Sequence, residues 1–270
     1  MTKLIFKKNL NFWQIASFAR AKKLDFKNVL TQAYNQNVLI DEDKEFLKKF
    51  IDSFENKKDI QSQLFQDVFA SFIVGEKFAK TFLEFGATDG FELSNSFMLE
   101  KNLMWNGVLS EPSPQWHTSL IENRKKSKII TKCIWSETGK KLEFFMSEMG
   151  ALSTIKNFVE NDKISIPENT NDRIKSGKII SVETISLNDV FLEYFNDKSP
   201  SYVSIDTEGS EYEILKSFDF KKYKPLVFTI EHNYTELEDK IDQLMFSNNY
   251  VRIFQKLTAF DSWYVLKDLV

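Results

Sequence analysis

Apolar residues recur at helical spacing through the first 58 residues of the chain. They predict amphipathic helices over residues 10–20, 26–34 and 41–54. We see no catalytic constellation among these residues. The sequence therefore predicts a helical N-terminal extension, residues 1–58, that packs either on a main domain of residues 59–270 or on a second copy of the chain in a homodimer.

After this extension the pattern changes to short apolar runs separated by helical segments. A predicted helix over residues 61–72 leads into the first run. The runs predict strands over residues 82–85, 107–110, 129–135, 142–146, 179–184, 202–205, 226–230, 250–256 and 263–267. Further helices are predicted over residues 94–103, 186–195 and 210–216. Such alternation is typical of an α/β fold with a mostly parallel sheet, and the last two runs predict an antiparallel hairpin.

The first predicted strand runs into two glycines four positions apart, in the stretch FLEFGATDG at residues 82–90. A glycine at the carboxyl end of a buried parallel strand lets a ligand lie directly on the main chain, so Gly86 and Gly90 indicate a nucleotide-binding turn. A dinucleotide fingerprint would need a third glycine at position 93, which is Leu93. The turn therefore disfavours a nicotinamide cofactor.

Two further groups of polar residues are expected near this turn. Ser94 and Asn95 can cap the helix over residues 94–103 and so bring helix N–H groups close to a bound ligand. Glu111 follows the second predicted strand, 21 residues after Gly90. A carboxylate at that place can accept hydrogen bonds from both hydroxyls of a ribose.

Composition narrows the class of protein. The 270 residues, 42% of them hydrophobic, allow one fair-sized domain plus an extension. A formal net charge of −3 gives no basic field, so no nucleic-acid partner is expected. The single cysteine, Cys133, excludes an internal disulfide and a cysteine-based zinc site. The sequence has no 18-residue apolar stretch and does not start like a signal peptide, so we expect a cytoplasmic protein without a transmembrane segment.

Several motifs in order resemble those of a known family. The loop from Glu84 to Gly90 resembles the first motif of class I S-adenosylmethionine (AdoMet) methyltransferases. Downstream, Ser94-Asn95-Ser96, Leu99-Glu100, Trp105-x-Gly107, Glu111-Pro112 and the stretch YVSIDTEGSE at residues 202–211 resemble the motifs of FkbM-type methyltransferases. Met104 departs from that pattern, because the family has glycine there. The resemblance covers residues 61–267.

The resemblance implies a fold, a cofactor and a reaction. The fold is a three-layer, Rossmann-like class I methyltransferase sheet of seven strands that closes with a C-terminal antiparallel hairpin. The cofactor is AdoMet, and the implied reaction methylates a hydroxyl of a sugar, glycolipid, polysaccharide or secondary metabolite, so the partner is a small-molecule or glycan acceptor. The implied cofactor-binding residues are Glu84, Gly86, Ala87, Asp89, Gly90, Ser94, Asn95, Glu111, Pro112, Trp135, Ser136 and Asp206. Trp135 and Ser136 are expected beside the adenine, and Glu208 and Glu211 also match the family motif.

Candidate catalytic residues lie at the ends of two later strands. Asp206 and His232 each follow a predicted strand and are expected at the edge that carries Gly86. A neutral alcohol is a poor nucleophile, so we expect Asp206 or His232 to act as a base and Glu208 to orient the acceptor. The alternative is a divalent ion held by Asp206 and Glu231, whose hard oxygen ligands at adjacent strand ends suit magnesium.

Two questions remain open at the level of sequence. Residues 156–178 are polar and without a sustained period, which predicts either a mobile lid or substrate loop, or disorder. The alternative functions are a nucleotide-sugar or NAD-binding enzyme on a similar sheet, and a non-catalytic AdoMet-binding module.

Overall fold

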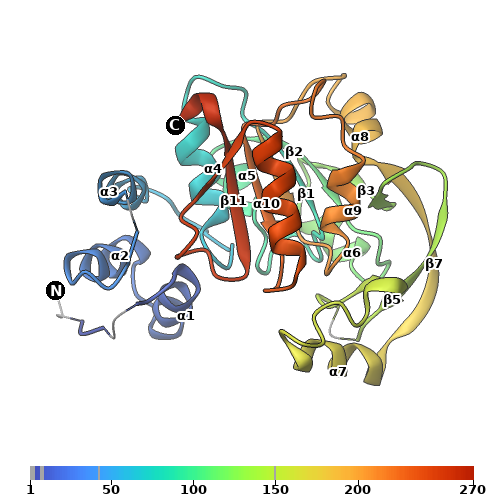
Figure 1. The fold of residues 1–270 in the computed structure, drawn as a ribbon, viewed down its shortest axis with the longest axis horizontal. Helices are drawn as coiled ribbons and strands as arrows, with labels where there is room; N and C mark the ends of the chain where they lie inside the picture. The colour runs from blue at the N-terminus through green and yellow to red at the C-terminus, as the bar shows by residue number, and fades with distance from the viewer. Residues whose placement is uncertain (1–3, 7–8, 42, 149) are drawn as a thin grey trace.

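The computed structural model describes residues 4–6, 9–41, 43–148 and 150–270. Seven strands form one twisted sheet at the centre of the molecule (Figure 1). In sheet order they are β10 (Tyr250–Ile253), β11 (Asp261–Leu266), β9 (Val227–Glu231), β8 (Tyr202–Ile205), β1 (Thr81–Phe85), β2 (Asn106–Ser110) and β3 (Lys128–Ile130). Only β11 runs against the others. The predicted α/β class, the seven-stranded sheet and its C-terminal hairpin are confirmed.

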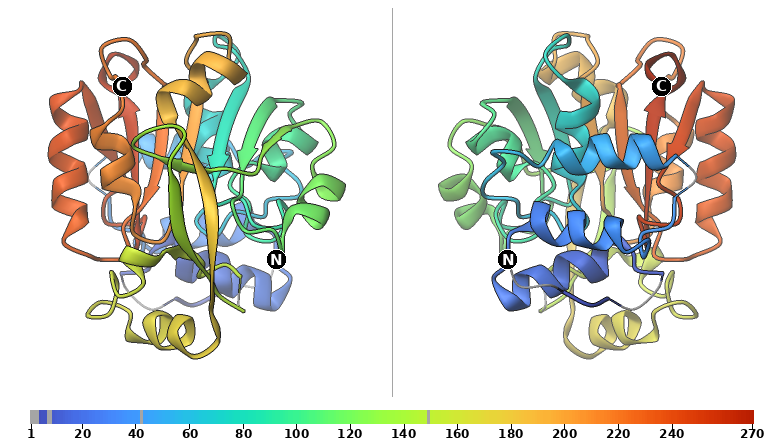
Figure 2. Two further views of the ribbon diagram at one scale, coloured as in Figure 1. Left: turned by 90° about the vertical axis from the view of Figure 1, so that its right-hand side faces the viewer. Right: turned by 90° about the vertical axis from the view of Figure 1, so that its left-hand side faces the viewer.

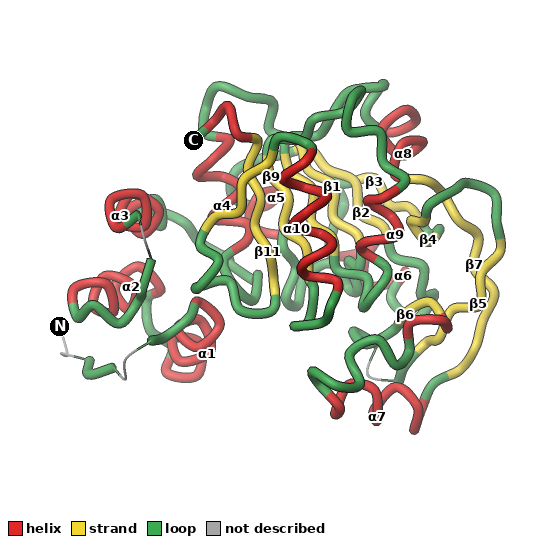
Figure 3. The backbone as a smooth tube through the Cα atoms, in the orientation of Figure 1, coloured by secondary structure: helices red, strands yellow, loops and turns green. Residues whose placement is uncertain are grey.

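Successive strand residues face opposite sides of the sheet, and each side is covered by helices. Phe82 and Tyr202 pack on the side of α4 (Gln66–Val74) and α5 (Phe97–Lys101), where Leu120 of α6 (His117–Asn123) also packs. Leu83 and Val203 pack on the other side. The helices there are α8 (Leu187–Tyr194), α9 (Glu211–Lys216) and α10 (Leu237–Ser247). The three layers are visible in Figure 3, and the chain ends with the short helix η2 (Lys267–Leu269).

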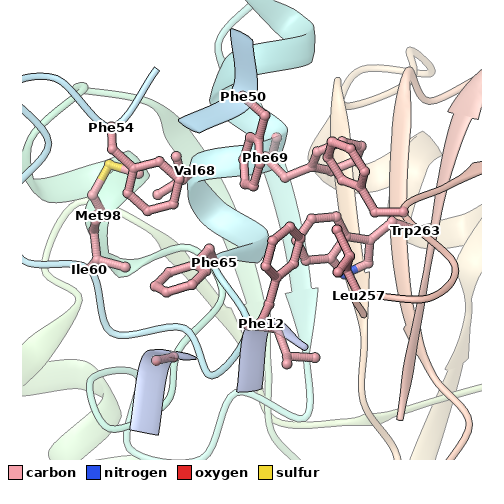
Figure 4. Close-up of a cluster of buried hydrophobic side chains, with 14 of the residues drawn as sticks. Phe12, Phe50, Phe54, Ile60, Phe65, Val68, Phe69, Met98, Leu257 and Trp263 are labelled. Carbon is pink, nitrogen blue, oxygen red and sulfur yellow. The ribbon is translucent and has the colours of Figure 1, made fainter. Parts of the chain in front are cut away.

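The N-terminal extension forms three helices, as predicted: α1 (Phe12–Lys22), α2 (Phe26–Asn35) and α3 (Lys44–Asp52). Residue 42, within the third predicted helix, lies outside the described residues. The extension is joined to the rest of the chain, because the Phe12 N–H donates to the Leu257 carbonyl at 2.8 Å and the Phe12 ring stacks on Trp263 at 5.6 Å between centroids. Figure 4 shows Phe12 and Phe50 in one apolar cluster with Phe69 and Trp263.

A second sheet, which the sequence analysis did not predict, follows β3. Its order is β4 (Cys133–Trp135), β7 (Lys178–Ser186), β5 (Lys141–Met146) and β6 (Thr154–Ile155). Between β6 and β7 the chain forms the short helix η1 (Lys156–Phe158) and α7 (Pro167–Ser176). We call residues 133–186 the cap. The cap and the extension lie at opposite ends of the molecule (Figures 1 and 2).

The structure corrects three predicted elements. The single strand over residues 129–135 is divided between the two sheets, with β3 in the main sheet and β4 in the cap. The segment 156–178 is neither disordered nor structureless, since it contains η1 and α7. The helix predicted over residues 61–72 begins only at Gln66, after Phe65 adopts a left-handed conformation. Within the described ranges, no helix is long and apolar enough to cross a membrane.

Candidate active site

A cavity of about 440 Å³ opens at the carboxyl ends of β1, β2, β8 and β9, under the cap. Its wall combines the loop after β1, Glu111 and Pro112 after β2, and acids after β8 and β9. The cap contributes Phe144, Ile155 and residues 150–153. In an α/β sheet this edge is the usual place for a ligand, as the sequence analysis expected.

The structure explains why positions 86 and 90 in the loop after β1 are glycine. Gly86 has φ +82°, and a Cβ there would lie 1.7 Å from the Asp206 carbonyl oxygen, so glycine allows β1 and β8 to end side by side. Gly90 does not line the cavity. A Cβ at Gly90 would lie 2.6 Å from side-chain carbons of Leu120 and Arg124. Glycine at position 90 therefore allows close packing of the loop on Leu120 of α6 and on Arg124.

Glu84 holds the loop that borders the cavity. Its carboxylate accepts hydrogen bonds from the Asn95 N–H at 2.8 Å and from the hydroxyls of Ser94 and Ser96. Ser94 and Asn95 were predicted to cap a helix that starts at residue 94, but α5 begins only after Ser96. The Asn95 side chain donates to Ser204 instead. Ser94 Oγ still accepts from the Phe97 N–H at 3.1 Å.

Arg124 is a buried residue that the sequence analysis missed. Its guanidinium is fully buried, lies 3.7 Å from Glu84 and donates to Glu100 at 3.0 Å and to the Gly90 carbonyl at 3.1 Å. It therefore fixes both ends of the loop from Glu84 to Ser96. Nothing in the local pattern distinguishes Arg124 from the exposed lysines that follow it.

Glu111 lies at the end of β2, as predicted, and is almost completely buried. Its two carboxylate oxygens accept the N–H groups of Thr88 at 2.9 Å and Ser113 at 2.7 Å. Burial raises the pKa of this carboxyl to about 7. Each oxygen keeps a lone pair beyond its backbone bond, so Glu111 retains the capacity to accept ribose hydroxyls.

The wall next to Glu111 differs from the prediction. Trp135 and Ser136 do not line the cavity, and the Trp135 ring packs on Phe158 with 6.1 Å between centroids. Cys133, Ile134 and Trp116 line it instead. The Trp116 indole N–H is buried without a hydrogen-bond partner among the described residues. A Cβ at Gly150 would lie 2.1 Å from the Trp116 ring, so the small residue at position 150 makes room for the indole.

Three carboxylates meet at the opposite wall. Asp206, Glu208 and Glu231 offer oxygens that all lie within 4.8 Å of one another. Asp206 and Glu231 hydrogen-bond each other, and burial raises the pKa of Asp206 to about 6. Burial also raises the pKa of Glu208 and of Glu231 well above the usual range. Because two carboxylates can share a hydrogen bond only through a proton, this pair can take up or release one.

Two other predicted acidic or basic residues lie outside the cavity wall. Glu211 accepts the N–H groups of Thr207 at 2.9 Å and Gly209 at 3.0 Å, so it closes the turn after β8. His232 does not line the cavity, although Glu231 and Asn233 on either side of it do. Its Nδ1 accepts from the Tyr234 N–H at 3.1 Å, and burial lowers its pKa to about 4. The expected place of His232 in the crevice is wrong, because neighbouring residues at a strand end point in opposite directions.

Arg173 of α7 connects the cap to the acids. Its guanidinium is completely buried and donates to the Leu152 carbonyl at 2.9 Å, to Asp162 at 2.6 Å and to Glu208. The Thr154 hydroxyl donates to the Glu208 carbonyl at 3.0 Å. The segment 156–178 is thus fastened to the rim of the site through Glu208.

The strand order, the single reversed strand and the cavity at the carboxyl edge define a class I methyltransferase fold. The methyltransferase FkbM domain matches residues 84–252, more than half of the chain, so the protein belongs to the FkbM methyltransferase family. AdoMet is its cofactor, and it is an AdoMet-dependent methyltransferase. The nucleotide-sugar or NAD-binding alternative is therefore wrong.

No curated protein matches the sequence. Solved structures with a similar fold include a putative caffeoyl-CoA O-methyltransferase from Staphylococcus aureus, with 12% identity, a TM-score of 0.44, and coverage of 89% of this chain and 98% of that chain. An O-methyltransferase from Bacillus cereus in complex with SAH has 12% identity, a TM-score of 0.41, and coverage of 88% and 97%. A precorrin-6y C5,15-methyltransferase from Geobacter metallireducens has 13% identity, a TM-score of 0.39, and coverage of 73% and 76%.

Proposed function

We propose that the protein transfers the methyl group of AdoMet to a hydroxyl oxygen of a sugar, glycolipid, polysaccharide or secondary-metabolite acceptor. The observation that carries this proposal is the pair of hydrogen-bonded carboxyl groups of Asp206 and Glu231 in the cavity wall. Methylation of a hydroxyl releases a proton, and a buried carboxylate with a raised pKa is suited to accept it.

The cofactor is assigned to the part of the cavity between the loop after β1 and Glu111. Bound AdoMet supplies an electrophilic methyl group on a sulfonium. Glu111 would accept hydrogen bonds from its ribose hydroxyls, and Ile134 and Trp116 would lie beside the adenine. Gly86, Ala87, Asp89, Ser94, Asn95 and Pro112 also line this cavity and stay in the proposed site. Glu84 also lines it, and acts by holding the loop.

The acceptor is assigned to the part of the cavity under the cap. Leu152, Ile155 and Ile166 give it an apolar wall, and Asn169 of α7 adds a polar group. Asp206 would remove the hydroxyl proton, with Glu231 sharing it, while Glu208 orients the acceptor. Arg173 and Asn233 hold Glu208 in place, the latter through a 3.2 Å hydrogen bond. Enclosure by the cap would exclude water from the methyl group.

The direct test is transfer of radiolabelled methyl from AdoMet to polysaccharide, glycolipid and small-molecule extracts of the source cells. Asp206→Asn should lower turnover about 10²- to 10⁴-fold, while the affinity for S-adenosylhomocysteine, measured by calorimetry, stays close to wild type. Undiminished turnover in Asp206→Asn would contradict the assignment of the base. Binding of S-adenosylhomocysteine without methylation of any extract would favour the non-catalytic module.

The assembly and location of the protein are also proposals. The extension exposes apolar side chains at Trp13, Leu24 and Ile40, 46%, 38% and 46% exposed, which could bury each other in a homodimer. Light scattering on the purified chain should then give twice the monomer mass, and Trp13→Glu should halve it. We propose a cytoplasmic location, which fractionation of the source cells would test.

A further inference from the structure

The carboxylates of Asp206, Glu208 and Glu231 are fixed in place by their surroundings. Asp206 follows β8, and its N–H donates to the Phe85 carbonyl at 3.2 Å. The Asn233 amide donates to Glu208 at 3.2 Å and to Glu231 at 2.8 Å. Arg173 pairs with Glu208 from the cap. The cluster is therefore a preorganised set of oxygens from three backbone positions.

A small cavity of about 10 Å³ lies behind this cluster and has its own polar wall. Asp206, Glu231, Asn95, Gln66 and Asp261 line it. That volume is close to the space that one water molecule needs. The small cavity thus provides a position for a single water beside two of the three carboxylates.

Two residues in the wall of the small cavity each have a buried oxygen without a hydrogen-bond partner among the described residues. Asp261 is 3% exposed; its Oδ2 accepts from Gln66 at 2.9 Å and from Trp263 at 3.2 Å, but its Oδ1 is unpartnered. Asn95 is 9% exposed; its Nδ2 donates to Ser204 at 3.0 Å, but its Oδ1 is unpartnered. Buried acceptors without a donor are rare in folded proteins.

One water in the small cavity would satisfy both oxygens, because a water has two hydrogens to donate. Its own oxygen would then face the carboxylates of Asp206 and Glu231. Anions repel that lone-pair side of a water, whereas a cation bound by the carboxylates attracts it. The two unpartnered oxygens and the three carboxylates therefore have a common explanation.

We propose that Asp206, Glu208 and Glu231 bind one divalent cation, Mg²⁺ or Mn²⁺, whose coordination includes a water held in the small cavity by Asp261 and Asn95. Carboxylates and water are the ligands that these hard cations prefer. Arg173 pairs with Asp162 as well as with Glu208, so its single charge does not neutralise the cluster, and a divalent cation would replace the proton that Asp206 and Glu231 share. Ligands at about 2.1 Å from a metal lie about 3 to 4 Å apart, so oxygens within 4.8 Å of one another need to move little.

The cation site does not depend on the methyl-transfer proposal, but its use in the reaction does. A divalent cation in this place would bind the acceptor hydroxyl oxygen and make its proton easier to remove. Glu208 and Glu231 would then act as ligands, and Asp206 would bind the cation through one oxygen and face the acceptor hydroxyl with the other. The proton would pass to the Asp206 carboxylate, as in the proposed function.

The test is a titration of the metal-free full chain with Mn²⁺, with and without S-adenosylhomocysteine, followed by calorimetry and by the loss of the free Mn²⁺ paramagnetic resonance signal. We expect one Mn²⁺ per chain. Glu231→Gln should weaken binding at least tenfold, and Asp261→Asn, which alters a proposed partner of the water but none of the three proposed ligands, should weaken it a few-fold. The control is Glu122→Gln, which removes an exposed carboxylate of α6 outside the cavity and should leave Mn²⁺ affinity unchanged.

The absence of saturable Mn²⁺ binding in the wild type would overturn the proposal. Equal affinity in Glu231→Gln would overturn it too, because the ion would then sit elsewhere. Retained affinity for S-adenosylhomocysteine shows that a variant is folded, and Asp206→Asn is the second ligand variant if Glu231→Gln fails this check. Methyl transfer that continues in EDTA would remove the cation from the reaction while leaving the proposed function intact. Mn²⁺ binding without methylation of any acceptor would support the cation site and contradict the proposed methyl transfer.

Discussion

Two regions of this molecule are equally buried and chemically opposite. Between the extension and the sheet lies an aromatic cluster, which we define by Phe12, Phe50, Phe65, Phe69, Phe254 and Trp263. Figure 4 labels these residues except Phe254. Its closest ring pair is Phe69 and Trp263, with 4.5 Å between the ring centroids. At the carboxyl edge of the sheet the buried groups are acids instead: Glu84, Glu111, Glu208, Glu211 and Asp261.

The difference separates stability from ligand binding. Apolar burial in the aromatic cluster stabilises the fold by roughly 25 cal/mol per Å² and needs no partner of defined geometry. Burial of a carboxyl destabilises the fold unless each oxygen finds a donor or a cation. We therefore expect changes in the aromatic cluster to lower stability without altering the site, and changes among the acids to alter binding first.

The largest effect should come from removal of the extension. A chain that begins at Asp59 exposes Phe65, Phe69 and Trp263, and it loses the hydrogen bond from Phe12 to Leu257. The sequence analysis treated residues 1–58 as an addition to the fold, but their share of the aromatic cluster leads us to expect aggregation or loss of cooperative thermal unfolding. A soluble, cooperatively unfolding chain of residues 59–270 that binds S-adenosylhomocysteine would show that the cluster is dispensable.

Phe50→Ala should lower the free energy of unfolding by about 3 to 5 kcal/mol, because it leaves a large cavity among close-packed rings. Denaturant unfolding measures this change, and Phe246→Ala is the control since Phe246 is 52% exposed. Calorimetry at low temperature should show an unchanged affinity for S-adenosylhomocysteine. A loss of affinity in the folded variant would break the separation between the two regions.

Arg173→Met should loosen the cap and leave the aromatic cluster intact. It leaves Asp162 and Glu208 buried without their cation, and breaking a buried pair costs about 3 to 5 kcal/mol. Limited proteolysis within residues 150–177 should become at least tenfold faster. Lys175→Met, at an exposed position of the same helix, should be cut like the wild type. Equal cleavage rates for the wild type, Arg173→Met and Lys175→Met would show that Arg173 does not hold the cap in place.

Glu111→Gln should weaken binding of S-adenosylhomocysteine by about 10- to 100-fold, since hydrogen bonds to a charged acceptor contribute about 1.5 to 3 kcal/mol each. Calorimetry measures the affinity, and exposed Glu122→Gln on α6 serves as the control. Unchanged affinity in a folded Glu111→Gln would remove Glu111 from the cofactor site.

The smallest effect should be the pH dependence of that same affinity. Ribose hydroxyls bind the Glu111 carboxylate, so protonation competes with the ligand. Because the pKa of Glu111 is raised to about 7, affinity should be about tenfold lower at pH 6 than at pH 8. Glu111→Gln should flatten the profile. A profile that falls with rising pH, or persists in Glu111→Gln, would mean that another group titrates.

The sequence alone determined the elements and the chemistry of the main sheet. The strands ending at Phe85, Ser110 and Ile205 and the acids Glu111 and Asp206 were predictable, because apolar runs, glycines and acids are local features and parallel strands place their carboxyl ends at one edge. Several motifs in order also resemble those of the FkbM methyltransferase family, and the family match confirmed that resemblance.

Only the tertiary structure decided which neighbours these residues have. The division of residues 129–135 depends on β7, about 50 residues further along the chain. The same holds for the direction of His232. The packing of Gly90 on Arg124 and the hydrogen bond from Arg173 to Glu208 also join segments that are distant in the sequence. Hydrophobic periodicity records which face of an element is buried but not what covers it, so these contacts are invisible in the pattern.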